Sequence, residues 1–254
     1  SEEVAQEEAE ERLLLSPQGA QADIATIPVC QTGFRSRPDY TTVAGLKSRV
    51  DSLNAKQRQV WDEVMDSIQH QLRHRNGDCE CENPPSQVLR FVSGGAGVGK
   101  SRLIEALTEA VEAVGEQVVL TAPSGIAAHN IEGVTIHRAF RIFPQTSKAA
   151  WTYEKLNHDA EKALYHAVGK AKLIVIDEIS MVSNKLLSFV HERLSSLHPA
   201  EGEQPLPFGG MNVVVLGDLL QLPPVNEPHC FAPLSPEDER KAHGGSSLAE
   251  PMQL

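Results

Sequence analysis

Short apolar runs alternate with helical apolar stripes along most of this chain. Four runs rich in Val, Ile and Leu are typical of parallel strands that are buried on both faces. These predicted strands are Val88–Ser93, Gln117–Ala122, Leu173–Asp177 and Asn212–Gly217. Apolar residues recur at helical spacing before and between them. The predicted helices are one that begins near Asn54, Lys100–Val114, Ile126–Asn130, Trp151–Val168 and Asn184–Leu197. This alternation favours an α/β fold with a doubly wound parallel sheet and helices on both faces.

The two ends of the chain lack this pattern. Residues 1–50 mix Glu, Gln, Ser, Thr and Pro, and we expect a largely disordered or loosely docked acidic and polar leader there. Residues 227–254 are rich in Pro, Gly, Ser and charge and predict a polar tail. One α/β lobe is therefore expected over residues 51–226.

The segment between the first predicted strand and the helix after it has the phosphate-binding pattern G-x-x-x-x-G-K-[ST]. Its residues are Gly94, Gly95, Ala96, Gly97, Val98, Gly99, Lys100 and Ser101. Glycines let backbone N–H groups wrap around phosphate oxygens, and the helix aims its positive end at the same anion. Lys100 would contact the outer phosphates and Ser101 would hold Mg²⁺. The alternative is a plain glycine-rich turn, which the strand and helix on either side disfavour.

Carboxylates follow two of the other predicted strands. Asp177 and Glu178 end the third strand, where Asp177 would hold Mg²⁺ beside Ser101 and Glu178 would orient or deprotonate a water. Asp218 ends the fourth, and Gln221 after it would contact the terminal phosphate or the attacking water. In parallel α/β sheets, ligands gather at the carboxyl ends of strands, where all of these residues are expected. The alternatives are an acidic strand end and a loop with an exposed Gln.

The segment after the second predicted strand favours contact with nucleic acid. Residues 121–128 offer small side chains, hydroxyls and backbone N–H groups, a surface that suits a sugar-phosphate backbone. Phe140 is either a base-stacking ring or a core residue. Gln57 also has two interpretations. With Asn54 it forms a capping-box pattern that starts a helix. It also stands in a Leu-Asn-x-x-Gln segment, in which the side-chain amide of Gln57 would hydrogen-bond adenine, and the two roles compete for this amide.

Composition changes this picture in three ways. The 254 residues are 41% apolar, enough for a real core, and no apolar run reaches membrane-spanning length. The net charge is -11, of which residues 1–12 carry -5 (six Glu, one Arg) and the remainder carries -6. A negative charge is unusual for a protein that binds nucleic acid, because such binding usually depends on Lys and Arg. Four cysteines are too few and too scattered for a disulfide framework. Cys79-x-Cys81 lacks a second pair or a His at zinc spacing, which favours a polar loop.

Taken together, the motifs resemble the PIF (petite integration frequency) family of superfamily 1 DNA helicases, which includes Helitron transposon helicases. The resemblance covers roughly residues 53–226 in order and spacing. It rests on Leu53-Asn54-x-x-Gln57, Gly94–Ser101, Thr121–Ala128, Thr135-Ile136-His137, Asp177-Glu178-Ile179-Ser180-Met181, Pro207-Phe208-Gly209-Gly210 and Gly217-Asp218-x-x-Gln221-Leu222-Pro223-Pro224-Val225.

The resemblance implies a P-loop, RecA-like lobe that uses ATP and Mg²⁺ to move 5′ to 3′ along single-stranded DNA and unwind duplexes. Lys100, Asp177, Glu178 and Gln221 would be catalytic, and Gln57 would read adenine. The DNA path would be lined by Thr121, Pro123, Ser124, Gly125, Thr135 and His137. It also implies roles in DNA repair, recombination and telomere maintenance, or in transposition. The expected location is the nucleus, with the mitochondrion as an alternative; the oligomeric state stays open.

Helicases of this kind use two RecA-like lobes, and the second supplies arginines to the ATP site. The sequence shows only the first lobe's motifs, so we expect a motor lobe whose partner lobe is missing. The alternatives are a nucleotide-binding switch or an inactive transposon-derived remnant that does not unwind DNA, and, less well supported, another P-loop enzyme such as a kinase.

Overall fold

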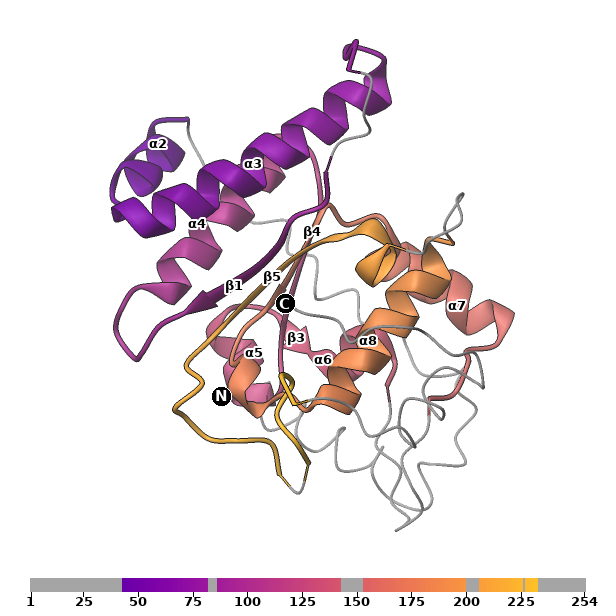
Figure 1. Cartoon of the computed structure of the whole chain (residues 1–254). Coiled ribbons are helices and arrows are strands. Elements are labelled where there is room, and N and C mark those ends of the chain that lie inside the picture. The colour runs from indigo at the N-terminus through magenta and orange to yellow at the C-terminus, as the bar shows by residue number, and fades with distance from the viewer. Residues whose placement is uncertain (1–42, 82–85, 143–152, 200–205, 226, 233–254) are drawn as a thin grey trace.

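A parallel five-stranded sheet forms the centre of the protein (Figure 1). The computed structural model describes residues 43–81, 86–142, 153–199, 206–225 and 227–232. The strands are β1 (Leu89–Ser93), β2 (Val118–Ala122), β3 (Val134–Thr135), β4 (Leu173–Ile176) and β5 (Asn212–Gly217). They lie in the order β1-β5-β4-β2-β3, and every pairing is parallel. The doubly wound parallel sheet expected from the sequence is confirmed.

The central strands are mostly apolar because the sheet is buried on both faces. In β5, Val213 and Val215 join one hydrophobic cluster, and Val214 and Leu216 join the other. Successive side chains of a strand point to opposite faces, so a strand covered on both sides needs apolar residues at every position.

Helices cover both faces of the sheet (Figure 1). One face carries α2 (Val43–Asp51), α3 (Ala55–Asn76), α4 (Lys100–Ala113) and α5 (Gly125–Asn130). The other carries α6 (Ile136–Phe140), α7 (His158–Leu164), its π-helical continuation η4 (Tyr165–Gly169) and α8 (Asn184–Leu197). Two short 3₁₀ turns complete the described elements, η5 (Ile179–Met181) and η6 (Pro207–Gly210). The bounds of β5 and α8 match the predicted ranges, and those of α4 differ by one residue.

Two expectations for helices and boundaries were wrong. The leader predicted over residues 1–50 is helical from Val43, because α2 docks on α4. Its Arg49 forms ion pairs with Glu105 at 2.5 Å and Glu109 at 2.8 Å, and its Val50 is buried. Residues 1–42 lie outside the described residues, as do residues 233–254 of the predicted tail. The helix predicted from Trp151 begins at His158, because Asn157 caps it by accepting from the backbone N–H of Ala160 at 2.8 Å.

One buried side chain ties several elements together at the amino ends of the strands. Asn212 Oδ1 accepts from the backbone N–H of Val88 at 2.9 Å, and its Nδ2 donates to the carbonyl oxygen of Lys172 at 2.9 Å. The amide also contacts Gln71 of α3. Asn212 therefore links β5 to the segments that lead into β1 and β4.

Candidate functional site

The five strands all end at the same edge of the sheet, and the predicted site residues follow those ends. The P-loop follows β1, Asp218 follows β5, Asp177 follows β4, and Pro123 follows β2. Two backbone hydrogen bonds join neighbouring ends: Gly94 N–H donates to the Gly217 carbonyl at 3.1 Å, and Asp177 N–H donates to the Thr121 carbonyl at 2.9 Å. The sheet order thus brings segments far apart in sequence to one edge.

The P-loop has a backbone that depends on its glycines. Gly97 and Gly99 have φ of 76° and 87°, in the left-handed region that side chains disfavour. Gly99 caps α4, which begins at Lys100 and directs its unpaired N–H groups and positive end at the loop. A Cβ on Gly94 would come within 2.6 Å of Val98 Cγ2. The loop is therefore tightly closed and has the form of an anion cradle.

Lys100 places its cation inside this loop. Its Nζ donates to the carbonyl oxygens of Gly94 at 2.7 Å and Gly95 at 3.0 Å. Burial raises the pKa of both Asp177 and Glu178, and the Lys100 charge partly opposes this rise. Ser101, next along α4, is exposed to solvent. The cation of Lys100 therefore acts on both carboxylates from within the P-loop.

Asp177 is a buried carboxylate with an unused oxygen. Only 7% of the residue is exposed, and its Oδ1 has no hydrogen-bond partner among the described residues. Burial raises the pKa of Asp177 above its usual range, against the opposing effects of the Glu178 backbone N–H and Lys100. A hard divalent cation takes carboxylate oxygens as ligands, so this orphaned oxygen fits Mg²⁺ at the predicted position.

Glu178 stands beside it in a strained conformation. Its φ of 51° is unusual for a residue with a side chain, a feature that clusters at functional sites. Burial raises the pKa of Glu178, and the neighbouring Asp177 and Asp218 raise it further, while Lys100 lowers it. A carboxyl group with a raised pKa is a better proton acceptor when it is ionised.

Gln221 lies on an exposed loop, where its side chain is hydrogen-bonded to Asp218. Its Nε2 donates to Asp218 Oδ2 at 3.3 Å, and Asp218 Oδ1 accepts from the Leu220 backbone N–H at 3.1 Å. Because Asp218 also affects the pKa of Glu178, the loop of Gln221 adjoins the carboxyl cluster.

Gln57 forms the capping box that was one of its two predicted roles, and it also contacts the P-loop. Its Oε1 accepts from the Asn54 N–H at 2.9 Å, which completes the capping box at the start of α3. Its Nε2 donates to the Val98 carbonyl at 3.1 Å and the Gly99 carbonyl at 3.0 Å. The amide is therefore fully engaged between the helix cap and the P-loop, a contact that sequence reasoning missed. Adenine reading by Gln57 stays a prediction, and it requires these bonds to be exchanged.

Two residues expected to line the DNA path are buried, and so is Phe140, for which a core position was one of two interpretations. Thr121 is fully buried in β2, where its hydroxyl donates to the Val175 carbonyl at 2.9 Å. Thr135 is 2% exposed, and its hydroxyl accepts from the Arg138 N–H as the cap of α6. Phe140 is 0% exposed and belongs to the core, so its stacking role is excluded. The side chains of Thr121 and Thr135 support the sheet edge and do not face a ligand.

The other residues of this predicted surface lie nearer to solvent. Pro123 and Ser124 are half-buried, while Gly125 is buried at the start of α5. Ser124 Oγ accepts from the Ala127 N–H and so caps α5. Burial lowers the pKa of His137 to about 4, which leaves its imidazole neutral at physiological pH. DNA contact by these residues stays a prediction, and His137 would contribute hydrogen bonds and not charge.

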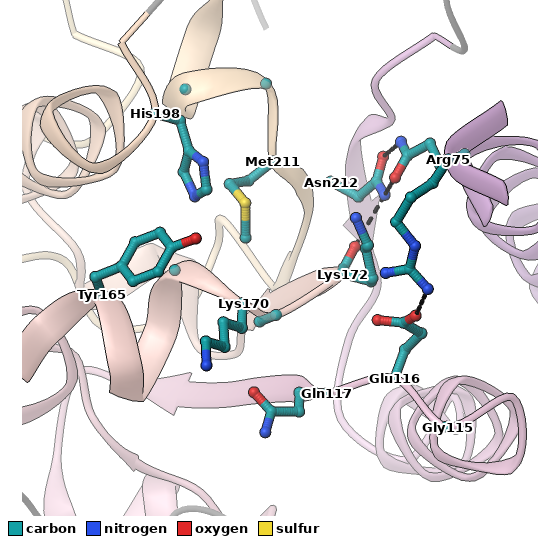
Figure 2. Close-up of a pocket in the computed structure, with 15 residues that line it drawn as sticks. Arg75, Gly115, Glu116, Gln117, Tyr165, Lys170, Lys172, His198, Met211 and Asn212 are labelled. Atoms are coloured by element: carbon teal, nitrogen blue, oxygen red, sulfur yellow. Dashed lines mark hydrogen bonds and ion pairs between the residues drawn. The ribbon is translucent and has the colours of Figure 1, made fainter.

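A cavity of about 650 Å³ lies at the opposite edge of the sheet (Figure 2). Gln117, Lys172 and Asn212, which line it, stand at the starts of β2, β4 and β5. Figure 2 shows Tyr165 and His198 on its other side, and the ion pair between Arg75 and Glu116 at 2.7 Å. Because the predicted phosphate-binding groups lie at the carboxyl edge, this cavity is not part of their site.

Within the described ranges, no helix is both long enough and apolar enough to cross a membrane.

The comparisons with known proteins agree with one another. The model of the PIF1-like helicase family matches residues 52–230. ATP-dependent DNA helicase PIF4 of Trypanosoma brucei brucei is 36% identical over 133 residues, which cover 52% of this chain and 16% of that protein. ATP-dependent DNA helicase Pif1 of Bdellovibrio bacteriovorus is 37% identical over 135 residues, which cover 53% of this chain and 29% of the relative. The chain thus spans less than a third of either relative.

Among solved structures, that of Bacteroides sp Pif1 in complex with ADP-AlF4 is similar with a TM-score of 0.48. It is 30% identical, and the match covers 69% of this chain and 34% of the other.

Proposed function

Because this chain belongs to the PIF1-like helicase family, we propose that it forms the nucleotide-binding lobe of an ATP-dependent DNA helicase. The observation that carries the proposal is the gathering of Lys100, Asp177 and Glu178 at one sheet edge, where their charges affect one another. A P-loop cation beside two carboxylates with raised pKa values is the arrangement that phosphoryl transfer to water needs.

Each residue of this group has a distinct role in the proposal. Lys100 exchanges its bonds to the Gly94 and Gly95 carbonyls for contacts with the outer phosphates of ATP. Asp177 and Ser101 would hold Mg²⁺, which neutralises charge on phosphate oxygens when it is bound. Glu178 orients the attacking water and accepts its proton. Gln221, tied to Asp218, contacts the terminal phosphate and links its presence to the following loop.

The proposed coupling to single-stranded DNA runs along the sheet edge. The N–H of Asp177 donates to the carbonyl of Thr121, which joins the end of β4 to the end of β2. The loop after β2 holds Pro123 and Ser124, the accessible part of the proposed DNA surface. A movement of Asp177 and Glu178 on ATP hydrolysis would therefore be transmitted through the adjacent strands β4 and β2 to the loop of Pro123 and Ser124.

We propose that a further cation from outside the described residues completes the ATP site. In the described part of the chain, Lys100 is the cation whose charge lowers the pKa values of Asp177 and Glu178. An additional arginine at the transferred phosphate raises turnover by about 10³–10⁵-fold in other nucleotide hydrolases. A second RecA-like lobe, in this polypeptide or a partner, is the proposed source.

The motif order across residues 53–226 supports three finer proposals through the family resemblance. These are 5′ to 3′ movement along single-stranded DNA, participation in DNA repair, recombination and telomere maintenance, and a nuclear location, with the mitochondrion as the alternative. Unwinding of a duplex with a single 5′ tail, compared with unwinding of a duplex with a single 3′ tail, measures the direction. Movement from 5′ to 3′ predicts that only the duplex with the 5′ tail is unwound.

The proposal is tested by ATP binding and by DNA-stimulated hydrolysis. Lys100→Ala removes the phosphate cation and should abolish binding of a fluorescent ATP analogue. Lys170→Ala is the matched control, because Lys170 lines the cavity at the opposite sheet edge. We expect single-stranded DNA to stimulate hydrolysis by the chain when it is joined to a second lobe. Unchanged ATP affinity in Lys100→Ala would refute the site.

The same assay separates the alternative function. ATP binding without any DNA-stimulated hydrolysis, in the chain alone and in a longer polypeptide, would identify a nucleotide-binding switch or an inactive remnant.

A further inference from the structure

Three side chains that commonly bind transition metals meet at the end of α3, far from the P-loop edge. They are His70, Cys79 and Cys81, and their ligand atoms all lie within 4.8 Å of one another. His70 Nε2 is 3.1 Å from Cys81 Sγ and 3.4 Å from Cys79 Sγ, and the two sulfurs are 2.6 Å apart. The sequence favoured a polar loop here because no His stood at zinc spacing. The fold corrects that interpretation by supplying His70.

The fold brings this group together through the cap of α3. Gly77 adopts the left-handed conformation with φ of 78°, and the Asp78 N–H donates to the Arg73 carbonyl at 2.8 Å. This cap reverses the chain beside the last turns of the helix. His70 lies two turns before the cap, and the returning segment carries Cys79 and Cys81. Both thiols of this segment lie within 3.4 Å of the imidazole nitrogen.

We propose that His70, Cys79 and Cys81 bind a Zn²⁺ ion through one imidazole nitrogen and two thiolates. Each thiol gives up its proton to solvent as its sulfur binds the metal. Two soft sulfur ligands and an imidazole are the donor set that Zn²⁺ accepts, and they disfavour Mg²⁺ and Ca²⁺. The described residues supply three ligands, and a water molecule fills the fourth tetrahedral position.

The distances are close to those that such a site needs. Tetrahedral Zn²⁺ with bonds of about 2.3 Å to sulfur and about 2.0 Å to nitrogen separates those ligand atoms by about 3.6 Å. The two observed distances between nitrogen and sulfur, 3.1 and 3.4 Å, fall just below this value. The two sulfurs must move apart by about 1 Å to reach tetrahedral spacing, which rotation about their χ1 angles provides. All three side chains are half-buried, so an ion can enter from solvent.

Metal binding at this place would fasten the end of α3 to the segment that leads into β1. At its other end, α3 begins beside Gln57, which bonds the P-loop. Because an ion that binds only the folded chain stabilises it by mass action, Zn²⁺ should raise the melting temperature. The proposal does not depend on nucleotide binding, and its test does not use helicase activity.

The test measures metal bound by the full chain. Reduced protein purified with zinc supplied is expected to hold stoichiometric zinc by elemental analysis. After the zinc is removed, Co²⁺ should produce the near-ultraviolet absorption of thiolate-to-metal charge transfer, and Zn²⁺ should displace it. Cys79→Ser, Cys81→Ser and His70→Gln should each lose the zinc and weaken Co²⁺ binding by at least about tenfold, since even outer contacts of a metal site are worth about 10–100-fold.

Cys230→Ser is the matched control, because the half-buried Cys230 contacts the Ile179 carbonyl and is not one of the three clustered ligands. Circular dichroism shows whether each variant is folded. Retention of zinc in Cys79→Ser or Cys81→Ser overturns the proposal. It is also overturned if reduced wild-type protein binds neither zinc nor Co²⁺, or if Cys79 and Cys81 form a disulfide in preference to binding added Zn²⁺.

Discussion

At the amino edge of the sheet, removal of the Asn212 side chain should destabilise the protein more than removal of the Gln71 side chain that contacts it. Asn212 is 1% exposed and starts β5. Its Oδ1 accepts from the Val88 N–H and its Nδ2 donates to the Lys172 carbonyl, both at 2.9 Å. Asn212→Ala leaves both backbone groups without these partners.

The expected magnitude follows from those two groups. The buried Val88 N–H without a partner costs about 1–3 kcal/mol, and the lost bond to the half-buried Lys172 carbonyl adds about 0.5–1 kcal/mol, so Asn212→Ala costs about 2–4 kcal/mol in free energy of unfolding. For a domain of this size, each kcal/mol lowers the melting temperature by about 2–4 °C. A typical domain is stable by only about 5–15 kcal/mol, so the variant loses a large part of its stability.

Urea unfolding followed by tryptophan fluorescence measures this loss. Trp61 reports on the core, because it packs between α3 and α4 and its Nε1 donates to the Ala106 carbonyl at 3.3 Å. Gln71→Ala is the control: it removes a side-chain partner of Asn212 but leaves Val88 and Lys172 satisfied, and it should cost only about 1 kcal/mol. If Asn212→Ala unfolds within about 0.5 kcal/mol of wild type, the two backbone groups find other partners and the reasoning is refuted.

Asn212→Asp adds a pH test of the same network. The carboxylate still accepts from Val88, but it does not donate to the Lys172 carbonyl, and it places a charge in the interior. Burial raises the folded-state pKa of such a carboxyl above its unfolded value. The deficit against wild type should therefore be full at neutral pH and should shrink as the pH falls towards the unfolded value. A deficit that is independent of pH would exclude a buried charge.

Three further predictions concern the carboxyl edge. Glu178→Gln should leave ATP affinity unchanged and slow hydrolysis by about 10²–10⁴-fold, and a rate near wild type in single-turnover assays would exclude its proton-accepting role. Asp177→Asn should stabilise the ligand-free protein at neutral pH, because burial raises the pKa of Asp177 and its ionised form therefore costs stability at pH values above the ordinary pKa of 3.8. Saturating Mg²⁺ and ATP, at about 100 times their Kd, should add about 2.7 kcal/mol to wild type and little to this variant in thermal shift measurements; equal gains would contradict the metal role. Burial lowers the pKa of His137 from 6.5 to about 4. His137 should therefore contribute up to about 3 kcal/mol of stability that is full above pH 6.5 and is lost as the pH falls to 4. His137→Gln should flatten this part of the urea-stability profile, and parallel profiles for the variant and wild type would disprove this contribution.

Much of the sheet could be predicted from local pattern because each central strand is buried on both faces. That environment favours apolar runs such as 213–216, and the helices between them have amphipathic stripes. β3 and α6 escaped prediction, because a two-residue strand and a five-residue helix are too short for periodicity to show. α2 escaped because its docking depends on the burial of Val50 and on ion pairs of Arg49 with α4, which no local pattern reveals.

The sequence by itself determined which residues stand at the carboxyl edge of the sheet. The P-loop spacing, the carboxylates after a buried run and the parallel strand pattern together predict Lys100, Asp177 and Glu178 at that edge, because the carboxyl ends of parallel strands share it. The strand order, with β5 between β1 and β4, comes from the fold.

Only the tertiary structure decided which polar side chains are buried and which residues far apart in sequence come into contact. Thr121 and Thr135 look like ligand donors in sequence, yet both are buried and their hydroxyls bond the backbone. Gln57 joins the helix cap to the P-loop, and His70 meets Cys79 and Cys81, because the fold sets α3 beside segments that follow it in the chain. Such contacts depend on where elements pack in space, which spacing along the chain does not encode.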